Sequence, residues 1–425
     1  MLPMTVDPLR LTMTEMGRRA RAAALQLAGL GRASKDAVLA AMQQRLAAAQ
    51  ASIQVANDED VAAATRMEKS AALIDRLRLD RTRFQGMLDT LDQLRGLADP
   101  VGTTLAQWRR PNGLLIEKKR VPIGVIAVIY ESRPNVTLDA AALCFKSGNA
   151  VILRGGSDSL RTSLAIHACL ADALHDCGVT EAAVQLVATA EREAVARLLE
   201  GLDGSIDVLI PRGGLDLVER VRREARVPVL GHLQGNCHVY VDAAADVAKA
   251  EAIVVNSKLR RTGVCGAAET LLIDATLTDE SARSLIRALL DGGCEVRGDA
   301  AVCQLDPRVA VATDDDWRTE YLAPIIAAAR VRGVDGAIAH IARFGSGHTE
   351  SIVTEDAVAA ERFLTEVDSA IVLHNASTQF ADGGEFGMGG EIGISTGRLH
   401  ARGPVGLEEL TTYKYVVRGS GQTRA

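Results

Sequence analysis

Residues 256–273 have the sequence NSKLRRTGVCGAAETLLI, which contains a single cysteine, Cys265. An apolar run with helical periodicity, residues 247–259, leads into this stretch, and a strand-like run, residues 269–274, closes it. The pattern predicts a helix, a loop and a strand in succession. It places the thiol in the loop, where a chain can present a reactive group.

We interpret Cys265 as a nucleophile, which acts as the thiolate rather than as the thiol. Lys258, Arg260 and Arg261 lie just upstream and would stabilise the thiolate if they face the sulfur. Taken alone, the same cysteine also fits a small buried apolar residue, and this alternative stays open at this point.

Composition narrows the class of protein. The chain has 425 residues, of which 48% are hydrophobic and 24% charged, enough for a large core and two or three domains. A net charge of −6, 3% aromatic residues and no basic block give no footprint for nucleic acid. No apolar run reaches the ~18 to 20 residues of a membrane span and no secretory signal is evident, so we expect a cytoplasmic protein. The 7 cysteines are scattered without CxxC or zinc-ligand spacing, which predicts reduced thiols and no structural metal.

The chain begins with an alanine-rich segment, residues 13–97, that is helical in pattern, with candidate caps at Ser34 and Asn57. Two strands of alternating character follow, joined by a turn at residues 111–113. A lone hairpin is marginally stable, so we expect it to pair with another subunit or with the end of the chain.

From residue 121 to residue 241 strands and helices alternate, which predicts a parallel sheet covered on both faces. Ligands of such sheets bind at the carboxyl ends of the strands. Two glycine loops occupy that position, RGGSDS at residues 154–159 and PRGG at residues 211–214, and both a phosphate site and a plain tight turn fit them. The predicted strands cover residues 124–130, 150–154, 184–187, 208–210 and 228–230.

A second α/β unit starts after residues 231–242 and contains the Cys265 loop, with helices expected near residues 280–291, 335 and 356. The tail is glycine-rich and contains Arg398, His400 and Arg402, for which an anion site and a plain loop are both open.

Several stretches between about residue 120 and residue 417 must be taken together: VPIGVIAVIYESRPNVTLDAA, KSGNAVILRGG, LIPRGG, GNCHVYVD, TGVCGAAETLL, FGSGHTESIVT, VDSAIVLHNAST and GEIGISTGRLHARGPVGLEELTTYKY. Together they resemble the aldehyde dehydrogenase superfamily and, more closely, its gamma-glutamyl phosphate reductase family.

The resemblance implies an α/β fold with a Rossmann-type cofactor domain, an α/β catalytic domain and a small β oligomerisation element. On this basis we expect a helical lead-in packed on the cofactor domain (1–107), a hairpin of the oligomerisation element (108–121), the dinucleotide-binding domain (122–232), the catalytic domain (233–374), and a return segment with the oligomerisation tail (375–425).

The resemblance also assigns candidate site residues, with Cys265 at the position of the nucleophile. Arg154 stands where many aldehyde dehydrogenases have a lysine, and with Arg161 it would pair with a 2′-phosphate, which favours NADPH over NADH. The remaining cofactor contacts implied are Gly155 and Gly156 after that arginine, Gly213 and Gly214 at the pyrophosphate, and Glu320 at the nicotinamide ribose.

Two positions depart from the hydrolytic members of the superfamily. His232 replaces the glutamate that activates water, which fits an acyl group exchanged with phosphate, and whether His232 is itself a base stays open. The oxyanion-hole asparagine usually precedes a proline, whereas Asn135 follows Pro134, and we keep Asn135 with the Cys265 backbone N–H as the donor pair.

The implied reaction is the NADPH-dependent reduction of L-glutamyl 5-phosphate to L-glutamate 5-semialdehyde through a cysteine thioester, the second step of proline biosynthesis from glutamate. A homo-oligomer and transient contact with a separate glutamate 5-kinase are the expected partners. A hydrolytic NAD(P)-dependent aldehyde dehydrogenase and a non-catalytic nucleotide-binding assembly protein are the alternatives. The side chains expected to meet the substrate's anionic groups are Arg133, Lys146, Arg398, His400 and Arg402.

Overall fold

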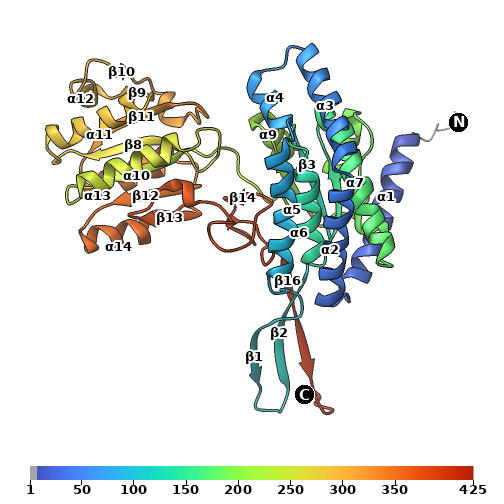
Figure 1. Cartoon of the computed structure of the whole chain (residues 1–425). Helices are drawn as coiled ribbons and strands as arrows, with labels where there is room; N and C mark the ends of the chain where they lie inside the picture. The colour runs from blue at the N-terminus through green and yellow to red at the C-terminus, as the bar shows by residue number, and fades with distance from the viewer. Residues whose placement is uncertain (1–6, 425) are drawn as a thin grey trace, which may run out of the picture. The chain divides into compact units, whose positions relative to one another are not determined.

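The computed structural model describes residues 7–424, which divide into two compact units (Figure 1). Within these residues, unit 1 comprises 7–231, 387–393 and 405–424, and unit 2 comprises 232–386 and 394–404. The tail from residue 375 onward, expected as one segment, is thus shared between both units. No helix in the described range has the length and apolar character that a membrane crossing needs.

Unit 1 begins with the predicted helical segment, which forms α1 (Pro8–Leu27), α2 (Arg32–Ala48), α3 (Gln50–Arg66), α4 (Ala71–Leu77) and α5 (Arg81–Gly96). Both predicted caps are wrong. Ser34 lies in the first turn of α2, whose N-cap is Gly31. Asn57 is buried inside α3, where its amide donates to the Leu77 carbonyl (2.8 Å) and accepts from the Leu79 N–H (2.8 Å). Its polar side chain therefore fixes the end of α4 instead of starting a helix.

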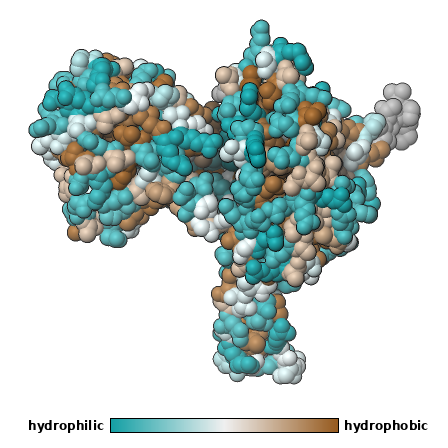
Figure 2. Space-filling view, in the orientation of Figure 1, coloured by the Kyte–Doolittle hydropathy of each residue, from teal (hydrophilic) through white to brown (hydrophobic). Residues whose placement is uncertain are grey.

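The predicted hairpin consists of β1 (Thr104–Arg109) and β2 (Leu115–Pro122), and β16 (Thr411–Arg418) pairs antiparallel with β2. Of the two partners expected for the hairpin, the chain's end is therefore present. We call these three strands the ribbon, which extends away from the helices of unit 1 (Figure 1). Its surface mixes hydrophobic and hydrophilic residues (Figure 2). The large apolar or aromatic side chains exposed on the ribbon are Leu105, Trp108, Tyr413, Tyr415 and Val417.

The sheet of unit 1 is parallel, with the order β5-β4-β3-β6. Because β4 and β6 lie on opposite sides of β3, the loops that leave β3 and β6 flank a topological switch point. A fifth strand was expected at 228–230, but this segment forms only an isolated bridge between Val229 and Leu209. The elements of this sheet are β3 (Val125–Tyr130), α6 (Val136–Lys146), β4 (Ala150–Arg154), α7 (Leu160–Asp176), β5 (Val184–Leu186), α8 (Arg192–Leu199), β6 (Val208–Arg212) and α9 (Leu215–Glu224).

Unit 2 contains a seven-stranded parallel sheet in the order β10-β9-β11-β8-β7-β12-β13. Its strands are β7 (Cys237–Val241), β8 (Ala268–Asp274), β9 (Glu295–Gly298), β10 (Ala310–Val311), β11 (Ile325–Val331), β12 (Thr349–Val353) and β13 (Ile371–His374). The helices between them are α10 (Val247–Leu259), α11 (Asp279–Asp291), α12 (Ala300–Cys303), α13 (Gly333–Phe344) and α14 (Ala357–Glu366), and the short strands β14 (Ile394–Ser395) and β15 (Gly403–Pro404) form a separate pair.

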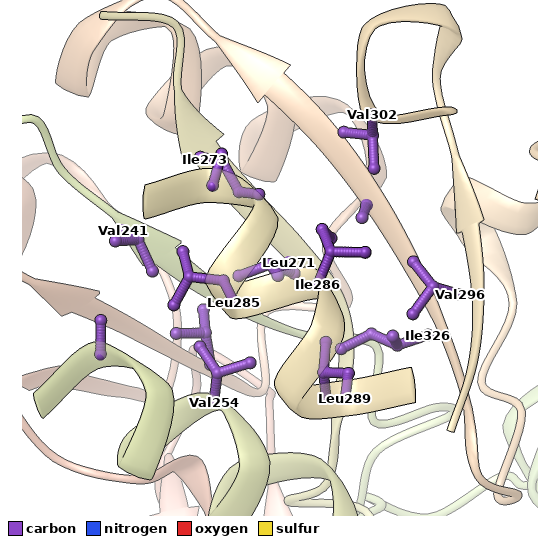
Figure 3. Packing of buried hydrophobic residues seen from close by; sticks show 14 of the residues in the cluster. Val241, Val254, Leu271, Ile273, Leu285, Ile286, Leu289, Val296, Val302 and Ile326 are labelled. Atoms are coloured by element: carbon purple, nitrogen blue, oxygen red, sulfur yellow. The ribbon is translucent and has the colours of Figure 1, made fainter. Parts of the chain in front are cut away.

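Neighbouring residues of one strand point to opposite faces of this sheet, and each face has its own core. Leu271 packs with α10, α11 and α12, as Figure 3 shows for the cluster around Leu285 and Leu289. Leu272 packs instead with Ile341 of α13 and Phe363 of α14. Unit 2 is therefore a second α/β unit, as predicted, and its parallel sheet is covered on both faces.

Candidate active site

The Cys265 loop joins α10 to the start of β8, as the sequence predicts, and leaves the cysteine partly exposed. Gly235 lies directly beneath it: a Cβ there would fall 2.1 Å from the Cys265 carbonyl oxygen and 2.7 Å from its Cα. Ile371, Ala381 and Ile394 form a small apolar cluster against which Cys265 packs. The loop is therefore held from two sides.

Two histidines of unit 2 approach the thiol. One ligand atom from each of His232, Cys265 and His348 lies within 4.8 Å of the other two. The two imidazoles meet edge to face, with ring centroids 4.8 Å apart. His232 Nδ1 donates to the Ile394 carbonyl (2.8 Å), which in the neutral ring places the lone pair on Nε2.

His348 is completely buried, and its Nε2 has no hydrogen-bond partner among the described residues. Its Nδ1 lies 2.8 Å from Thr349 Oγ1 and 3.6 Å from the sulfur of Cys237. Cys237 in turn donates its S–H to the Cys265 carbonyl (3.1 Å). A buried polar atom without a hydrogen-bond partner costs free energy, so His348 Nε2 indicates a binding site for a group that can pair with this nitrogen.

The other thiols near this region are poor nucleophiles. Burial raises the pKa of Cys237 well above its usual value, and burial raises the pKa of Cys294 to about 12. Cys265 differs from them by being partly exposed beside two imidazoles. The alternative that Cys265 is a small buried apolar residue therefore loses its basis.

One part of the sequence hypothesis about thiolate stabilisation is wrong. Lys258 does not offer its charge to the sulfur, because its ammonium forms an ion pair with Glu269 in which both side chains are buried. Burial raises the pKa of Glu269 to about 7. Arg260 and Arg261 are exposed, and the Arg260 guanidinium lies 3.5 Å from Gln379 Oε1.

Glu320 lies in unit 2, where the backbone N–H of Gly235 donates a hydrogen bond to it. Burial raises its pKa, and nearby His232 and Lys258 oppose that rise. The carboxylate is thus tied to the segment that supports the Cys265 loop.

In unit 1, both glycine loops leave a strand and enter a helix, as predicted, but their glycines first serve packing. A Cβ at Gly155 would meet the Tyr130 ring at 3.1 Å, and one at Gly156 would meet the Ser132 nitrogen at 3.2 Å. At the second loop, a Cβ on Gly213 would fall 2.5 Å from the Glu131 carboxylate, which already accepts the Gly214 N–H (2.8 Å). A phosphate at the start of α9 would have to displace Glu131.

The two arginines expected at a 2′-phosphate differ. Arg154 donates to the carbonyls of Gly155 (2.8 Å) and Ala190 (3.2 Å), and its buried Nε has no partner among the described residues. Arg161 forms ion pairs with Glu59 (3.4 Å) and Asp60 (3.3 Å). Only Arg154 therefore retains unsatisfied donor capacity for an anion.

Comparisons with known proteins fit this geometry. The sequence model of the aldehyde dehydrogenase family matches residues 12–295 and 287–416. A gamma-glutamyl phosphate reductase from Parvibaculum lavamentivorans is 58% identical over 97% of this chain and 98% of its own, and one from Rhodopseudomonas palustris is 59% identical over 98% and 97%. The crystal structure of the gamma-glutamyl phosphate reductase of Thermotoga maritima is 43% identical, with a TM-score of 0.94, and covers 97% of this chain and 100% of that one.

The chain belongs to the aldehyde dehydrogenase family and, within it, to the gamma-glutamyl phosphate reductases. An acetylating aldehyde dehydrogenase from Geobacillus thermoglucosidasius shares the fold at 17% identity and a TM-score of 0.69, covering 98% of each chain. The sequence interpretation of the family and its fold is confirmed.

The structure contradicts the prediction that Lys146 binds the substrate. It is fully buried at the end of α6, where its ammonium pairs with Asp36 of α2. A buried lysine that forms an ion pair with an aspartate of another helix holds the two helices together and is not available to an anionic substrate.

Arg398 and Arg402 both pair with Asp368, the latter at 2.7 Å, and the hydrogen bond from Arg402 lowers the pKa of Asp368 below its usual value. His400 is exposed with a left-handed backbone (φ 66°) between them. A substrate anion here would compete with Asp368 for the two guanidinium groups. Arg133 lies partly buried in the loop after β3.

Asn135 lies in the same loop of unit 1 and donates to Asp139 Oδ2 (2.8 Å). Burial raises the pKa of Asp139 to about 6, and the bond from Asn135 opposes the rise. The Asn135 amide is thus oriented by a neighbour one helical turn away.

Sequence reasoning missed His348 and the part that Cys237 plays beside it. A signal was present, because His348 immediately precedes the run TESIV, Cys237 begins CHVYV, and Cys265 shortly precedes AETLLID. In a parallel sheet the starts of adjacent strands share one edge, and β8, β7 and β12 are adjacent.

Proposed function

We propose that this chain reduces L-glutamyl 5-phosphate to L-glutamate 5-semialdehyde and releases phosphate, a step of proline biosynthesis from glutamate. The observation that carries the proposal is the partly exposed Cys265 thiol beside two imidazoles, in a chain 58% identical to a gamma-glutamyl phosphate reductase. A thiolate beside an imidazole that accepts its proton is suited to acyl transfer.

The Cys265 thiolate attacks the acyl carbon of the substrate. A carbon–sulfur bond forms and the bond to the phosphate oxygen breaks, which releases inorganic phosphate and leaves a thioester. When bound, NADPH supplies the hydride that converts this thioester to a thiohemiacetal. The thiohemiacetal collapses to the semialdehyde and restores Cys265.

Two further functions in this mechanism are proposed for His232 and for Asn135 with the Cys265 backbone. His232 Nε2 accepts the thiol proton, since its Nδ1 is held by the Ile394 carbonyl. Asn135 and the Cys265 backbone N–H are the proposed donors to the negative oxygen of both tetrahedral intermediates, and loss of one such donor typically costs about 10²-fold or more in rate. Water must stay away from the thioester, because hydrolysis would return glutamate.

Aldehyde dehydrogenases use a nicotinamide cofactor, and the switch point of the unit 1 sheet fits one. The proposal of NADPH rests on Arg154, whose buried Nε has no partner in the part of the chain that the structure describes and whose guanidinium suits a 2′-phosphate. Gly155, Gly156, Gly213 and Gly214 are the proposed backbone contacts, and Glu320 is proposed at the nicotinamide ribose.

One assay separates this function from its alternatives: oxidation of the semialdehyde with NADP or NAD, with and without phosphate or arsenate. We expect turnover that requires phosphate and prefers NADP. Turnover without phosphate would favour a hydrolytic aldehyde dehydrogenase. No turnover, together with slow labelling of several thiols by iodoacetamide, would favour a non-catalytic protein.

Three further proposals concern partners and place. The exposed apolar side chains of the ribbon (Figure 2) support a symmetric homo-oligomer, which light scattering tests. The lability of an acyl phosphate supports transient contact with a glutamate 5-kinase, tested by pull-down and by the lag time of a coupled assay. A cytoplasmic location is tested by cell fractionation.

A further inference from the structure

The fold brings together three metal-binding side chains that the sequence spacing keeps far apart. The ligand atoms of His232, Cys265 and His348 all lie within 4.8 Å of one another. Zinc bound by sulfur and imidazole nitrogen at ~2.3 Å and ~2.0 Å requires ligand atoms roughly 3.5 Å apart. Side-chain adjustment of about 1 Å therefore brings this triplet to a tetrahedral site.

The two imidazoles are already oriented as metal ligands usually are. Each has Nδ1 in a hydrogen bond, His232 to the Ile394 carbonyl (2.8 Å) and His348 to Thr349 Oγ1 (2.8 Å), which fixes the ring and directs metal binding to Nε2. His348 Nε2 is buried, and no described residue satisfies it. A metal would remove the cost of that unpaired atom.

The donor set also selects the ion. One thiolate and two imidazoles suit Zn²⁺ and other late divalent metals, whereas Mg²⁺ and Ca²⁺ prefer oxygen. Three protein ligands leave a fourth position open. His232 and Cys265 are partly exposed, so an ion can enter from solvent even though His348 is buried.

We propose that His232, Cys265 and His348 form a reversible inhibitory site for Zn²⁺. Binding releases the thiol proton to solvent and engages the sulfur lone pair that would attack the substrate. The inhibition rests on the proposed function, in which Cys265 is the nucleophile, whereas the binding of metal does not.

Cobalt(II) reports on binding directly, because a tetrahedral cobalt–thiolate site has visible bands and a sulfur-to-metal charge-transfer band. We expect the full-length wild-type protein to bind one Co²⁺ with both features and to lose them to Zn²⁺. Cys265→Ser should abolish the charge-transfer band. His348→Gln and His232→Gln should each weaken the binding of Co²⁺ by about tenfold or more.

The matched control is Cys177→Ser, which removes an exposed thiol of unit 1 and should leave the spectrum unchanged. His348 is buried, so if His348→Gln does not fold, His232→Gln at a partly exposed position decides the outcome. A charge-transfer band that survives Cys265→Ser, or Co²⁺ affinity unchanged in the folded histidine variants, would overturn the proposal. So would a wild-type protein that gives no band.

Zinc should also inhibit turnover and slow the labelling of Cys265 by iodoacetamide, and EDTA should reverse both effects. If the cobalt spectrum depends on the three residues but no phosphate-dependent turnover is found, the metal site stands and the proposed function fails. Turnover that Zn²⁺ does not inhibit, in a protein whose spectrum shows bound metal, would overturn the inhibitory role.

Discussion

The two sheets of this protein place their candidate functional groups at opposite edges. In unit 1 the glycine loops and Asn135 follow strands and lie at the carboxyl edge, where ligands of parallel sheets usually bind. In unit 2 Cys265, Cys237 and His348 precede or begin strands and lie at the amino edge. Under the proposed function, one type of parallel α/β sheet serves cofactor binding at one edge and covalent chemistry at the other.

The two edges also differ in what they hold before a ligand arrives. At the carboxyl edge of unit 1, the Glu131 carboxylate already accepts a hydrogen bond from the Gly214 N–H, and Arg161 forms ion pairs with Glu59 and Asp60. At the amino edge of unit 2, a buried nitrogen of His348 has no partner among residues 7–424. Binding at the first edge would therefore exchange existing partners, which suits the proposed cofactor because it must leave, whereas the second edge would offer the proposed reaction an unpaired nitrogen.

The largest predicted effect tests whether the amino edge of the unit 2 sheet holds the nucleophile. Cys265→Ser should lower phosphate-dependent oxidation of the semialdehyde by about 10⁴-fold or more, because the weakly nucleophilic hydroxyl cannot replace the thiolate. Cofactor affinity, measured by fluorescence titration, should stay unchanged. Cys177→Ser serves as the control. Activity of the Cys265 variant within about tenfold of wild type would remove this thiol from the mechanism.

The next largest effect concerns the charges buried behind the amino edge. Lys258→Met leaves the buried Glu269 carboxylate without its ammonium, and breaking such a pair typically costs about 3 to 5 kcal/mol. We expect a large fall in the urea midpoint of unfolding. The double variant with Glu269→Leu should recover most of the loss, since an apolar pair of similar volume replaces both charges. Equal stability of wild type and Lys258→Met would show that this pair is not a structural element.

A smaller effect is expected beneath the Cys265 loop. Gly235→Ala places a Cβ 2.1 Å from the Cys265 carbonyl oxygen, so the loop must move. Because misplacement of a reacting group by about 1 Å costs on the order of 10²-fold, kcat/KM should fall by about that factor without loss of folding.

Gly263→Ala is the matched control in the same loop. Its Cβ meets no atom of the described residues within 4 Å and its backbone is not left-handed, so activity should change little. Similar activities of the two variants would mean that the position of this loop does not limit the rate.

The sequence alone predicts features that depend on neighbouring residues better than features that depend on contacts between residues far apart in the chain. The boundaries of α10 and β4 were predicted to the residue, because helical periodicity and β-rich runs are local signals. The false cap at Asn57 arose because its partners lie in the next helix and beyond, which no local pattern reveals.

The site shows the same limit. Cys265 was identified from its loop, whereas His348 is 83 residues away along the chain and reaches the thiol only through the order of the parallel strands, which single-sequence patterns do not give. Lys146 and Lys258 were misassigned for a related reason. The sequence around a lysine gives no sign that the lysine will be buried against an acidic partner from another element.

The smallest predicted effect concerns the carboxyl edge of the unit 1 sheet. Two neighbouring arginines were expected there to bind the same 2′-phosphate. Arg154→Ala should raise the KM for NADP by about tenfold, roughly 1.4 kcal/mol, and change the KM for NAD much less, because only NADP carries the 2′-phosphate. Arg161→Ala should change either KM less, since its guanidinium is already paired with Glu59 and Asp60. The measurement with NAD is the control for a distorted loop, because a distorted loop would raise the KM for both cofactors. Equal losses for NADP and NAD would reduce Arg154 to a scaffold for the Gly155 and Ala190 carbonyls.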